Sequence, residues 1–245
     1  MRNFKMVLEY DGTRYKGFQR LGDSPDTIQG KIEDMLSKLL DEEVLILGSS
    51  RTDAGVHALG QVINFKSSTT ISKKELLDAS NNYLPEDISI ISVDEVSERF
   101  HSRLNAKSKK YRYTVDNNSY RRVLSRKYSY YVSTSLDIDA MQKAASHLIG
   151  SHDFKSFTSL KSKKKSTQRI IHSIDISKED GYIHFDFHGD GFLQHMIRII
   201  TGTLIEVGLH NMSPNDISKI LDKKDRSLSG PTIYPNGLFL LEVLY

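Results

Sequence analysis

The chain carries two successive rounds of the same order of elements: strand, helix, strand, strand, helix, strand. In the first round, apolar residues alternate before Asp11-Gly12 and then recur at helical spacing after Thr27. Ser72 and Glu75 have the spacing of a capping box, which predicts the start of a second helix. The expected elements are a strand at 3–10, a helix at 28–40, strands at 44–48 and 61–66, a helix at 72–83 and a strand at 88–93.

The second round repeats this order without residue-level identity to the first. Its expected elements are a strand at 109–115, a helix at 137–149, strands at 170–176 and 182–188, a helix at 192–207, a short helix opening at 213–214 and a strand at 238–245. This order predicts an α+β fold of two βαββαβ halves with helices on one face. We place the halves at residues 1–104 and 105–245, with the junction in the segment 97–108.

Composition excludes several kinds of chemistry. The sequence has no cysteine, which excludes disulfides, thiolate nucleophiles and cysteine-based metal sites. The N-terminal residues run directly into a strand pattern, and no apolar run approaches the roughly 20 residues of a membrane span. We therefore expect a cytoplasmic protein that does not enter a membrane.

Positive charge is concentrated in two clusters, although the formal net charge is only +3. Tyrosines are interleaved with the first cluster, a pattern typical of phosphate contact combined with base stacking. A solvated surface is an equal alternative for the second. The first cluster is Arg99, Arg103, Lys107, Lys109, Lys110, Arg112, Arg121, Arg122, Arg126 and Lys127; the second is Lys155, Lys161, Lys163, Lys164, Lys165 and Arg169.

The polar loop 48–58 between two predicted strands combines Arg51, Asp53 and His57. Arg51 can keep the Asp53 carboxylate ionised, and the small residues around them allow another molecule to approach closely. Asp53-Ala54-Gly55 is also an ordinary turn sequence. The loop alone therefore predicts either a turn or a catalytic site.

The predicted helix 192–207 is apolar around most of its surface, apart from Gln194, His195 and Arg198. A guanidinium in such a helix requires a partner, either a carboxylate or a phosphate. A structural ion pair and a functional one are equally compatible with this pattern.

Histidines and aspartates raise the alternative of a metal site, as in a metal-dependent phosphoesterase. His184, Asp186 and His188 share one strand face, and His147, His152, Asp153 and His195 could join them. Their spacing matches no known zinc or hydrolase signature, and a polar strand face explains the first three. We therefore expect no metal. Glycine loops for phosphates or dinucleotides are also absent from the sequence.

Several motifs together resemble the TruA family of tRNA pseudouridine synthases, in the order of that family and over nearly the whole chain. Ser50, Phe18 and Gln194 stand where this family commonly has glycine, tryptophan and histidine. The motifs are Glu9-Tyr10-Asp11-Gly12-Thr13, Gly17-Phe18-Gln19-Arg20, Arg51-Thr52-Asp53-Ala54-Gly55-Val56-His57-Ala58, Gly60-Gln61-Val62, Phe100-His101-Ser102-Arg103, Lys110-Tyr111-Arg112-Tyr113, His152-Asp153-Phe154, Phe192-Leu193-Gln194-His195-Met196-Ile197-Arg198 and Gly237-Leu238.

The resemblance implies isomerisation of uridine to pseudouridine in tRNA, at positions 38–40 of the anticodon stem-loop, without cofactor or metal. It makes Asp53 the catalytic carboxylate, Arg198 its ion-pair partner and Tyr111 the ring that stacks on the target base. Arg198 would then be closer to Asp53 than Arg51, which would point toward RNA. The expected substrate contacts are Arg51, His57, Arg20, Arg103, Lys110 and Arg112.

The resemblance also implies two RRM-like (ferredoxin-like) halves with joined sheets, an active-site cleft between them and a homodimer that shares a tRNA. The main alternative is a non-catalytic RNA-binding protein made of two RRM-like units. It explains the tyrosines and charges, but the sequence lacks a recognisable RNP1 pattern.

Overall fold

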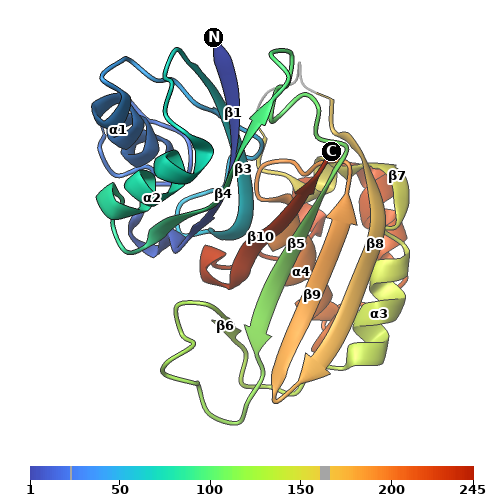
Figure 1. The fold of residues 1–245 in the computed structure, drawn as a ribbon. Helices are drawn as coiled ribbons and strands as arrows, with labels where there is room; N and C mark the ends of the chain where they lie inside the picture. The colour runs from blue at the N-terminus through green and yellow to red at the C-terminus, as the bar shows by residue number, and fades with distance from the viewer. Residues whose placement is uncertain (23, 161–165) are drawn as a thin grey trace. The chain divides into compact units, whose positions relative to one another are not determined.

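The computed structural model describes residues 1–22, 24–160 and 166–245, which form two compact units (Figure 1). The first unit comprises Met1–Lys107 together with Phe239–Tyr245, and the second comprises Ser108–Leu238. The change of unit at 107/108 lies three residues after the division expected from the sequence (107 − 104). Residues Phe239–Tyr245, which the expected division places in the second half, belong to the first unit.

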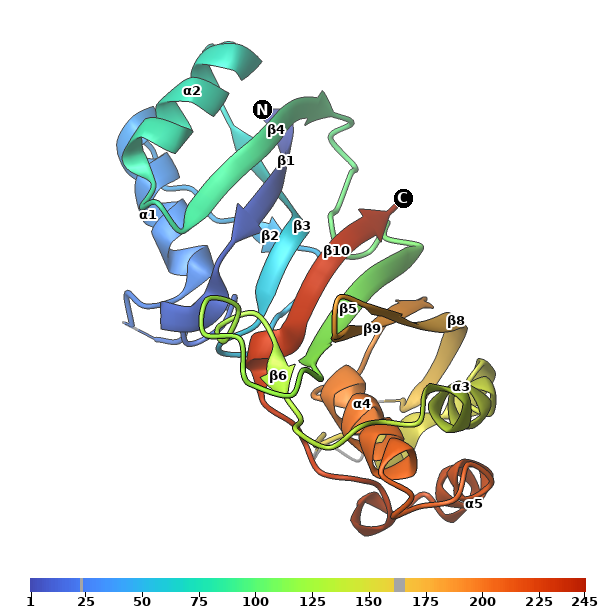
Figure 2. The ribbon, with the colours of Figure 1, turned by 90° about the horizontal axis from the view of Figure 1, so that it is seen from below.

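The first unit is built on a mixed sheet in the order β4-β1-β3-β10, with the short strand β2 paired to β3. β1 is antiparallel to both β3 and β4, and β10 is parallel to β3. Two helices, α1 and α2, cover one face of this sheet (Figure 2). The bounds are β1 Arg2–Tyr10, α1 Ile28–Leu40, β2 Leu47–Gly48, β3 His57–Ser67, α2 Lys73–Tyr83, β4 Ile88–Val96 and β10 Leu238–Leu244, with a 3-10 turn, η1, at Gly12–Arg14.

Both helices of the first unit begin where the capping residues predict. The Thr27 side chain accepts a hydrogen bond from the Gly30 amide at 3.2 Å. Ser72 and Glu75 exchange hydrogen bonds at 3.1 and 3.2 Å, which confirms the capping box. These caps satisfy amide groups that a helix leaves without an intrahelical partner.

The strand predicted at 44–48 is paired only at Leu47–Gly48. The reason is that side chains of α1 accept hydrogen bonds from backbone amides of residues 44 and 46, which precede the paired residues. Ser37 Oγ accepts from the Val44 amide at 2.9 Å, and Glu33 Oε1 accepts from the Ile46 amide at 3.1 Å. The apolar alternation is still present because Val44 and Ile46 are buried, but the backbone pairs with side chains instead of a strand.

The second unit has an antiparallel sheet in the order β5-β9-β8-β7, and the short β6 is parallel to β5. Helices α3 and α4 cover one face of it, with α5 outside them (Figure 2). The bounds are β5 Ser108–Asp116, β6 Tyr130–Tyr131, α3 Ile138–Ser146, β7 Gly150–Asp153, β8 Gln168–Glu179, β9 Tyr182–Gly189, α4 Met196–Gly208 and α5 Asp216–Lys223, with 3-10 turns η2 at Phe154–Phe157, η3 at Arg226–Leu228 and η4 at Pro235–Gly237.

The predicted helix 192–207 begins four residues later than expected. His195 has a φ of 61°, in the left-handed region, and the helix starts only at Met196. Phe192 and Leu193 continue the apolar pattern because they pack from a loop, so periodicity alone extended the prediction too far. The α+β class, the two repeated halves and the helices on one face are confirmed.

Candidate functional site

Asp53 begins a tight turn. The Val56 amide donates to the Asp53 carbonyl at 3.2 Å, and Gly55 has a φ of 76°, which is accessible at little cost only to glycine. The turn expected at Asp53-Ala54-Gly55 is confirmed. Asp53 is partly exposed, whereas Thr52 before it and Val56 at the end of the turn are buried.

Gln61 on β3 fixes the segment that leads into this turn. Its Oε1 accepts from the Ser49 hydroxyl at 2.8 Å and from the Ser50 amide at 3.2 Å. Its Nε2 donates to the Ser50 carbonyl at 2.9 Å. Because Gln61 is completely buried, these bonds are shielded from competing water.

Thr52, the residue before Asp53, is held from β1 and from the segment after η1. The hydroxyls of Tyr10 and Thr52 are 2.7 Å apart, and the Phe18 amide donates to the Thr52 carbonyl at 3.0 Å. Gly17 makes this approach possible, since its φ is 104° and a Cβ there would lie 2.9 Å from the Thr52 carbonyl oxygen. The backbone around Asp53 is therefore anchored by two neighbouring strands.

His57, expected to contact substrate, lies inside the first unit with 1% of its surface exposed. Its Nδ1 accepts from the Gly12 amide at 3.1 Å, and its ring stacks on Phe239 with centroids 4.7 Å apart. Asp11 Oδ1 is also 3.1 Å from Nδ1, but a nitrogen that accepts from Gly12 has no proton to give Asp11. In this arrangement His57 ties η1 to the start of β3.

The arginines expected at the substrate fall into two groups. Arg51 and Arg103 are exposed, and the pKa of Arg103 is lowered, first by partial burial of its guanidinium and then by the positive charge of Arg51. Two guanidinium groups that repel each other favour an anion beside them. Arg20, in contrast, is paired with Glu33 at 2.8 Å and Asp34 at 2.6 Å.

The alternation of β5 separates the expected site residues of the second unit onto two faces of its sheet. Tyr111 is on the helix-covered face, where its ring meets the edge of Phe192 with centroids 5.3 Å apart. Lys110 and Arg112 occupy the other face, and Arg112 makes two 2.7 Å hydrogen bonds to Asp186. Lys110 and Arg112 therefore cannot act on the same side of the sheet as the Tyr111 ring.

Arg198 lies in the first turn of α4, and its Nε donates to the Ile233 carbonyl at 2.8 Å. The segment that carries Ile233 lies directly on α4. The Gly230 amide donates to the Thr203 hydroxyl at 2.9 Å, and a Cβ at Gly202 would lie 2.1 Å from the Pro231 carbonyl oxygen. Close packing through glycine thus sets the direction of the Arg198 side chain.

The residues proposed for a metal site have other partners. Within the described ranges, no three His, Asp or Glu side chains gather in a geometry that could hold a metal ion. Asp186 pairs with Arg112, Asp153 lies 2.9 Å from Lys224, and His184 Nδ1 is 3.2 Å from the Thr114 hydroxyl. The structure gives the metal alternative no support.

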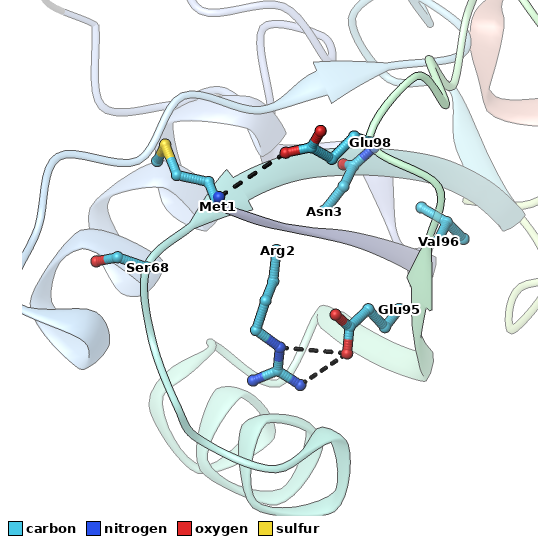
Figure 3. A pocket seen from close by; sticks show the side chains of 7 residues that line it. All are labelled: Met1, Arg2, Asn3, Ser68, Glu95, Val96 and Glu98. Carbon is cyan, nitrogen blue, oxygen red and sulfur yellow. Dashed lines mark hydrogen bonds and ion pairs between the residues drawn. The ribbon is translucent and has the colours of Figure 1, made fainter.

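A pocket of about 500 Å³ opens beside the start of β1 (Figure 3). Its charges are already paired with one another. Arg2 binds Glu95 at 2.9 Å and also donates to the Thr69 and Ile71 carbonyls, and the Met1 amino group lies 3.8 Å from Glu98. These pairs make the pocket a structural feature of the strand edge.

The two basic clusters are described only in part. Arg121 lies over the Tyr131 ring at 5.3 Å, an arrangement that supports the expected mixture of cations and aromatics. Lys161, Lys163, Lys164 and Lys165 of the second cluster lie outside the described residues.

In the part of the chain that the structure describes, no helix is long and apolar enough to span a bilayer.

Sequence reasoning gave Gln61 and Tyr10 no individual role, although both hold the Asp53 loop. The available signal was their place in short motifs, Glu9-Tyr10-Asp11-Gly12 and Gly60-Gln61-Val62, beside strand ends. The sequence does not predict the contacts of these two side chains with residues 49–52, because those contacts depend on strand register and on the side-chain rotamers.

Comparisons with known proteins agree over nearly the full chain. A family model described as tRNA pseudouridine synthase matches residues 6–105 and 144–245. The chain is 50% identical to tRNA pseudouridine synthase A of Bacillus sp. (strain KSM-64), covering 94% of each chain, and 47% identical to tRNA pseudouridine synthase A 1 of Clostridium tetani (strain Massachusetts / E88), covering 100% of each. Among solved structures, a chain of a Cbf5-Nop10-Gar1 complex matches with a TM-score of 0.36 and 12% identity, over 82% of this chain and 45% of the other, a likeness too weak to carry an argument.

Proposed function

Because the chain belongs to the tRNA pseudouridine synthase family, and is thereby an enzyme that isomerises uridine in tRNA, we propose that its targets are positions 38–40 of the anticodon stem-loop and that Asp53 carries the reaction. The observation that carries the Asp53 assignment is the anchored turn, in which partly exposed Asp53 directly follows buried Thr52 and the segment before it is held by hydrogen bonds with Tyr10 and Gln61. Reactive groups placed in this way lose little entropy when the substrate binds.

The reaction needs no cofactor. The bond from uracil N1 to ribose C1′ breaks, the ring turns, and a new bond forms from C5 to C1′. The proton on C5 is lost and N1 gains one, so the formula and the oxidation state are unchanged. An ionised Asp53 serves as nucleophile or stabilises positive character on the sugar.

Tyr111 and Arg198 are the partners that we propose for Asp53. The Tyr111 ring can stack on the detached base, and its hydroxyl can assist removal of the C5 proton. Arg198 would pair with the Asp53 carboxylate and keep it charged, with Arg51 turned toward RNA. Support comes from the packing of Tyr111 against Phe192 and from the Ile233 carbonyl, which holds one side of the Arg198 guanidinium.

We further propose that phosphates of the stem-loop bind near Arg51 and Arg103, whose mutual repulsion an anion would relieve. Lys110 and Arg112 would contact RNA on the face of their sheet opposite the Tyr111 ring. We assign Arg20 and His57 to support of the fold around the Asp53 loop. A cytoplasmic homodimer that shares one tRNA, and a cleft between joined sheets, stay predictions from the family resemblance.

The function is tested by mapping pseudouridine in an unmodified tRNA transcript that carries uridines at 38, 39 and 40. Incubation with the purified protein, without added metal or nucleotide, should convert at least one of these uridines and no uridine elsewhere. Conversion only outside the anticodon stem-loop would reject the proposed position, whereas tight tRNA binding without any conversion would favour a non-catalytic binding protein.

A further inference from the structure

A second pocket in the second unit, of about 250 Å³, has the composition of a nucleotide site. It lies where the end of β5, the segment around β6 and the turn η4 come together. Its size is below the roughly 300–1,000 Å³ of pockets for drug-sized ligands, so it suits a single ring system. The residues that matter are Arg121, Arg126, Tyr130, Tyr131, Tyr234 and Asn236.

The pocket offers aromatic faces beside positive charge. The rings of Tyr130 and Tyr234 are 6.1 Å apart at 31°, and Tyr234 is 71% exposed. Arg121 lies over Tyr131, and Arg126 Nη1 donates to the Val123 carbonyl at 2.6 Å. A guanidinium has five N–H donors, so that bond leaves donors of Arg126 for a phosphate. Tyrosine faces beside arginines are the combination that binds unpaired nucleotides.

Asn236 adds a hydrogen-bond acceptor, its Oδ1, that no group among the described residues donates to. Its Nδ2 donates to the Ser129 carbonyl at 2.6 Å and to the Arg126 carbonyl at 3.0 Å, which fixes the orientation of the amide. Its Oδ1 is buried and has no hydrogen-bond partner among the described residues. A buried acceptor of this kind costs free energy unless something donates to it. The N–H groups on the edge of a nucleobase are donors of the required kind.

The pocket is connected through the backbone to the arginine that we place in catalysis. Arg198 donates to the Ile233 carbonyl, and the Tyr113 hydroxyl donates to the carbonyl of the next residue, Tyr234, at 2.5 Å. The Tyr234 backbone is thus fixed beside Arg198 while its ring extends to the pocket. Burial raises the pKa of Tyr113 well above its ordinary value, although the charge of Arg198 acts in the opposite direction, so that hydroxyl stays protonated and donates.

We infer that this pocket binds one extruded RNA nucleotide near the target uridine in the chain, with the base on Tyr130 and Tyr234, a base N–H on Asn236 Oδ1, and the phosphate at Arg121 and Arg126. The inference rests on the proposed function, because the RNA reaches the pocket only while its target uridine is engaged. The pocket contributes to substrate selection, because it binds a nucleotide of an unpaired, flexible loop more tightly than one that is stacked in a helix.

The test is equilibrium binding of an anticodon stem-loop RNA and of a series in which each loop nucleotide other than the target is made abasic in turn. One abasic position should weaken binding to the wild type about tenfold, the size of one lost stacking contact. Tyr234→Ala should weaken binding of the intact RNA by a smaller factor and reduce the effect of that abasic position, because Tyr130 and Asn236 still contact the base, whereas Tyr234→Phe keeps the wild-type response.

The matched control is Tyr83→Ala, which removes an exposed tyrosine at the end of α2 in the first unit and should bind every RNA as the wild type does. Circular dichroism establishes that the variants are folded. Equal effects of each abasic position on wild type and Tyr234→Ala would overturn the inference. The binding measurement does not depend on turnover, so the two proposals can fail separately. If the protein forms pseudouridine but the effect of no abasic position depends on Tyr234, only the pocket is rejected. If the effect of one abasic position depends on Tyr234 but no pseudouridine forms, only the proposed function is rejected.

Discussion

At the scale of single residues, the environment of Asp53 consists of bonds made to the loop backbone. Gln61 holds Ser50, and Tyr10 and Phe18 hold Thr52, so the residue before the carboxylate has little freedom. Such an arrangement stabilises charge in a transition state without requiring the protein to reorganise during the reaction.

Tyr10→Phe tests this arrangement with the loss of one oxygen atom. The variant loses the 2.7 Å bond to Thr52 and should lose about 1 kcal/mol of unfolding free energy. We expect kcat to fall about tenfold with little change in KM, because the Asp53 loop becomes less well positioned. Steady-state kinetics on a tRNA transcript and urea denaturation measure the two effects.

The control for Tyr10→Phe is Tyr182→Phe, which removes an equivalent 2.7 Å hydroxyl contact, to Ser125 in the second unit. It should have a similar cost in stability and leave kcat unchanged. A kcat for Tyr10→Phe equal to that of Tyr182→Phe would mean that the Thr52 bond only supports the fold.

At the scale of elements, α4 and the segment that crosses it position Arg198. Gly202→Ala would place a Cβ 2.1 Å from the Pro231 carbonyl oxygen and push away the segment that holds Arg198 through Ile233. We expect a loss of about 1–3 kcal/mol in stability and a larger fall in kcat than in substrate affinity. Thermal unfolding and single-turnover kinetics measure these effects.

Gly208→Ala, in the same helix, is the matched control. Its Cβ would meet the flexible Met141 side chain at 2.8 Å, and alanine is favoured over glycine in a helix by about 1 kcal/mol. It should change stability by about 1 kcal/mol or less and keep full activity. Loss of activity in both variants, or in neither, would contradict the positioning role of the 230–233 segment.

The polar face of β5 and β9 predicts a dependence of stability on pH. Burial, and then the neighbouring Arg112, lower the pKa of His184. The unfolded chain, with a pKa of about 6.5, therefore takes up the proton first as the pH falls. This contribution to stability is complete above about pH 6.5 and is lost as the pH falls toward the folded-state pKa.

Denaturation midpoints between pH 8 and pH 5 test this dependence. The midpoint of His184→Gln should fall less over this interval than the midpoint of the wild type, because the variant lacks the group whose pKa the fold lowers. A His184→Gln curve parallel to the wild type would show that His184 takes no part.

Element prediction succeeded where the signals are local. Thr27 and Ser72 cap their helices as their motifs indicate, because a cap depends on residues three positions apart. The predicted strand was wrong at 44–46, where side chains of α1 accept the backbone hydrogen bonds. The predicted helix was wrong at 192–195, where the left-handed conformation of His195 keeps the chain in a loop. The strand β7 was missed because Gly150–Asp153 is short and polar.

At the scale of the whole molecule, the order of elements was sufficient to predict two repeated α+β halves. It could not place Phe239–Tyr245, which pairs in parallel with β3 of the first unit, because strand partners across such a long separation leave no local pattern. The candidate site residues come from motifs, and their catalytic and binding roles stay predictions. The side-chain partners of Arg20, His57 and Arg112 depend on tertiary packing and became visible only in the structure.

The central claim, that Asp53 carries uridine isomerisation, is tested most directly by tritium release from tRNA labelled at C5 of uridine. Forming the C5–C1′ bond expels the C5 hydrogen, so release reports the chemical step itself. Wild type should release tritium, and Asp53→Asn, which keeps the size of the side chain but not its charge, should release none above background while still binding tRNA. Release by Asp53→Asn at the wild-type rate would contradict the claim.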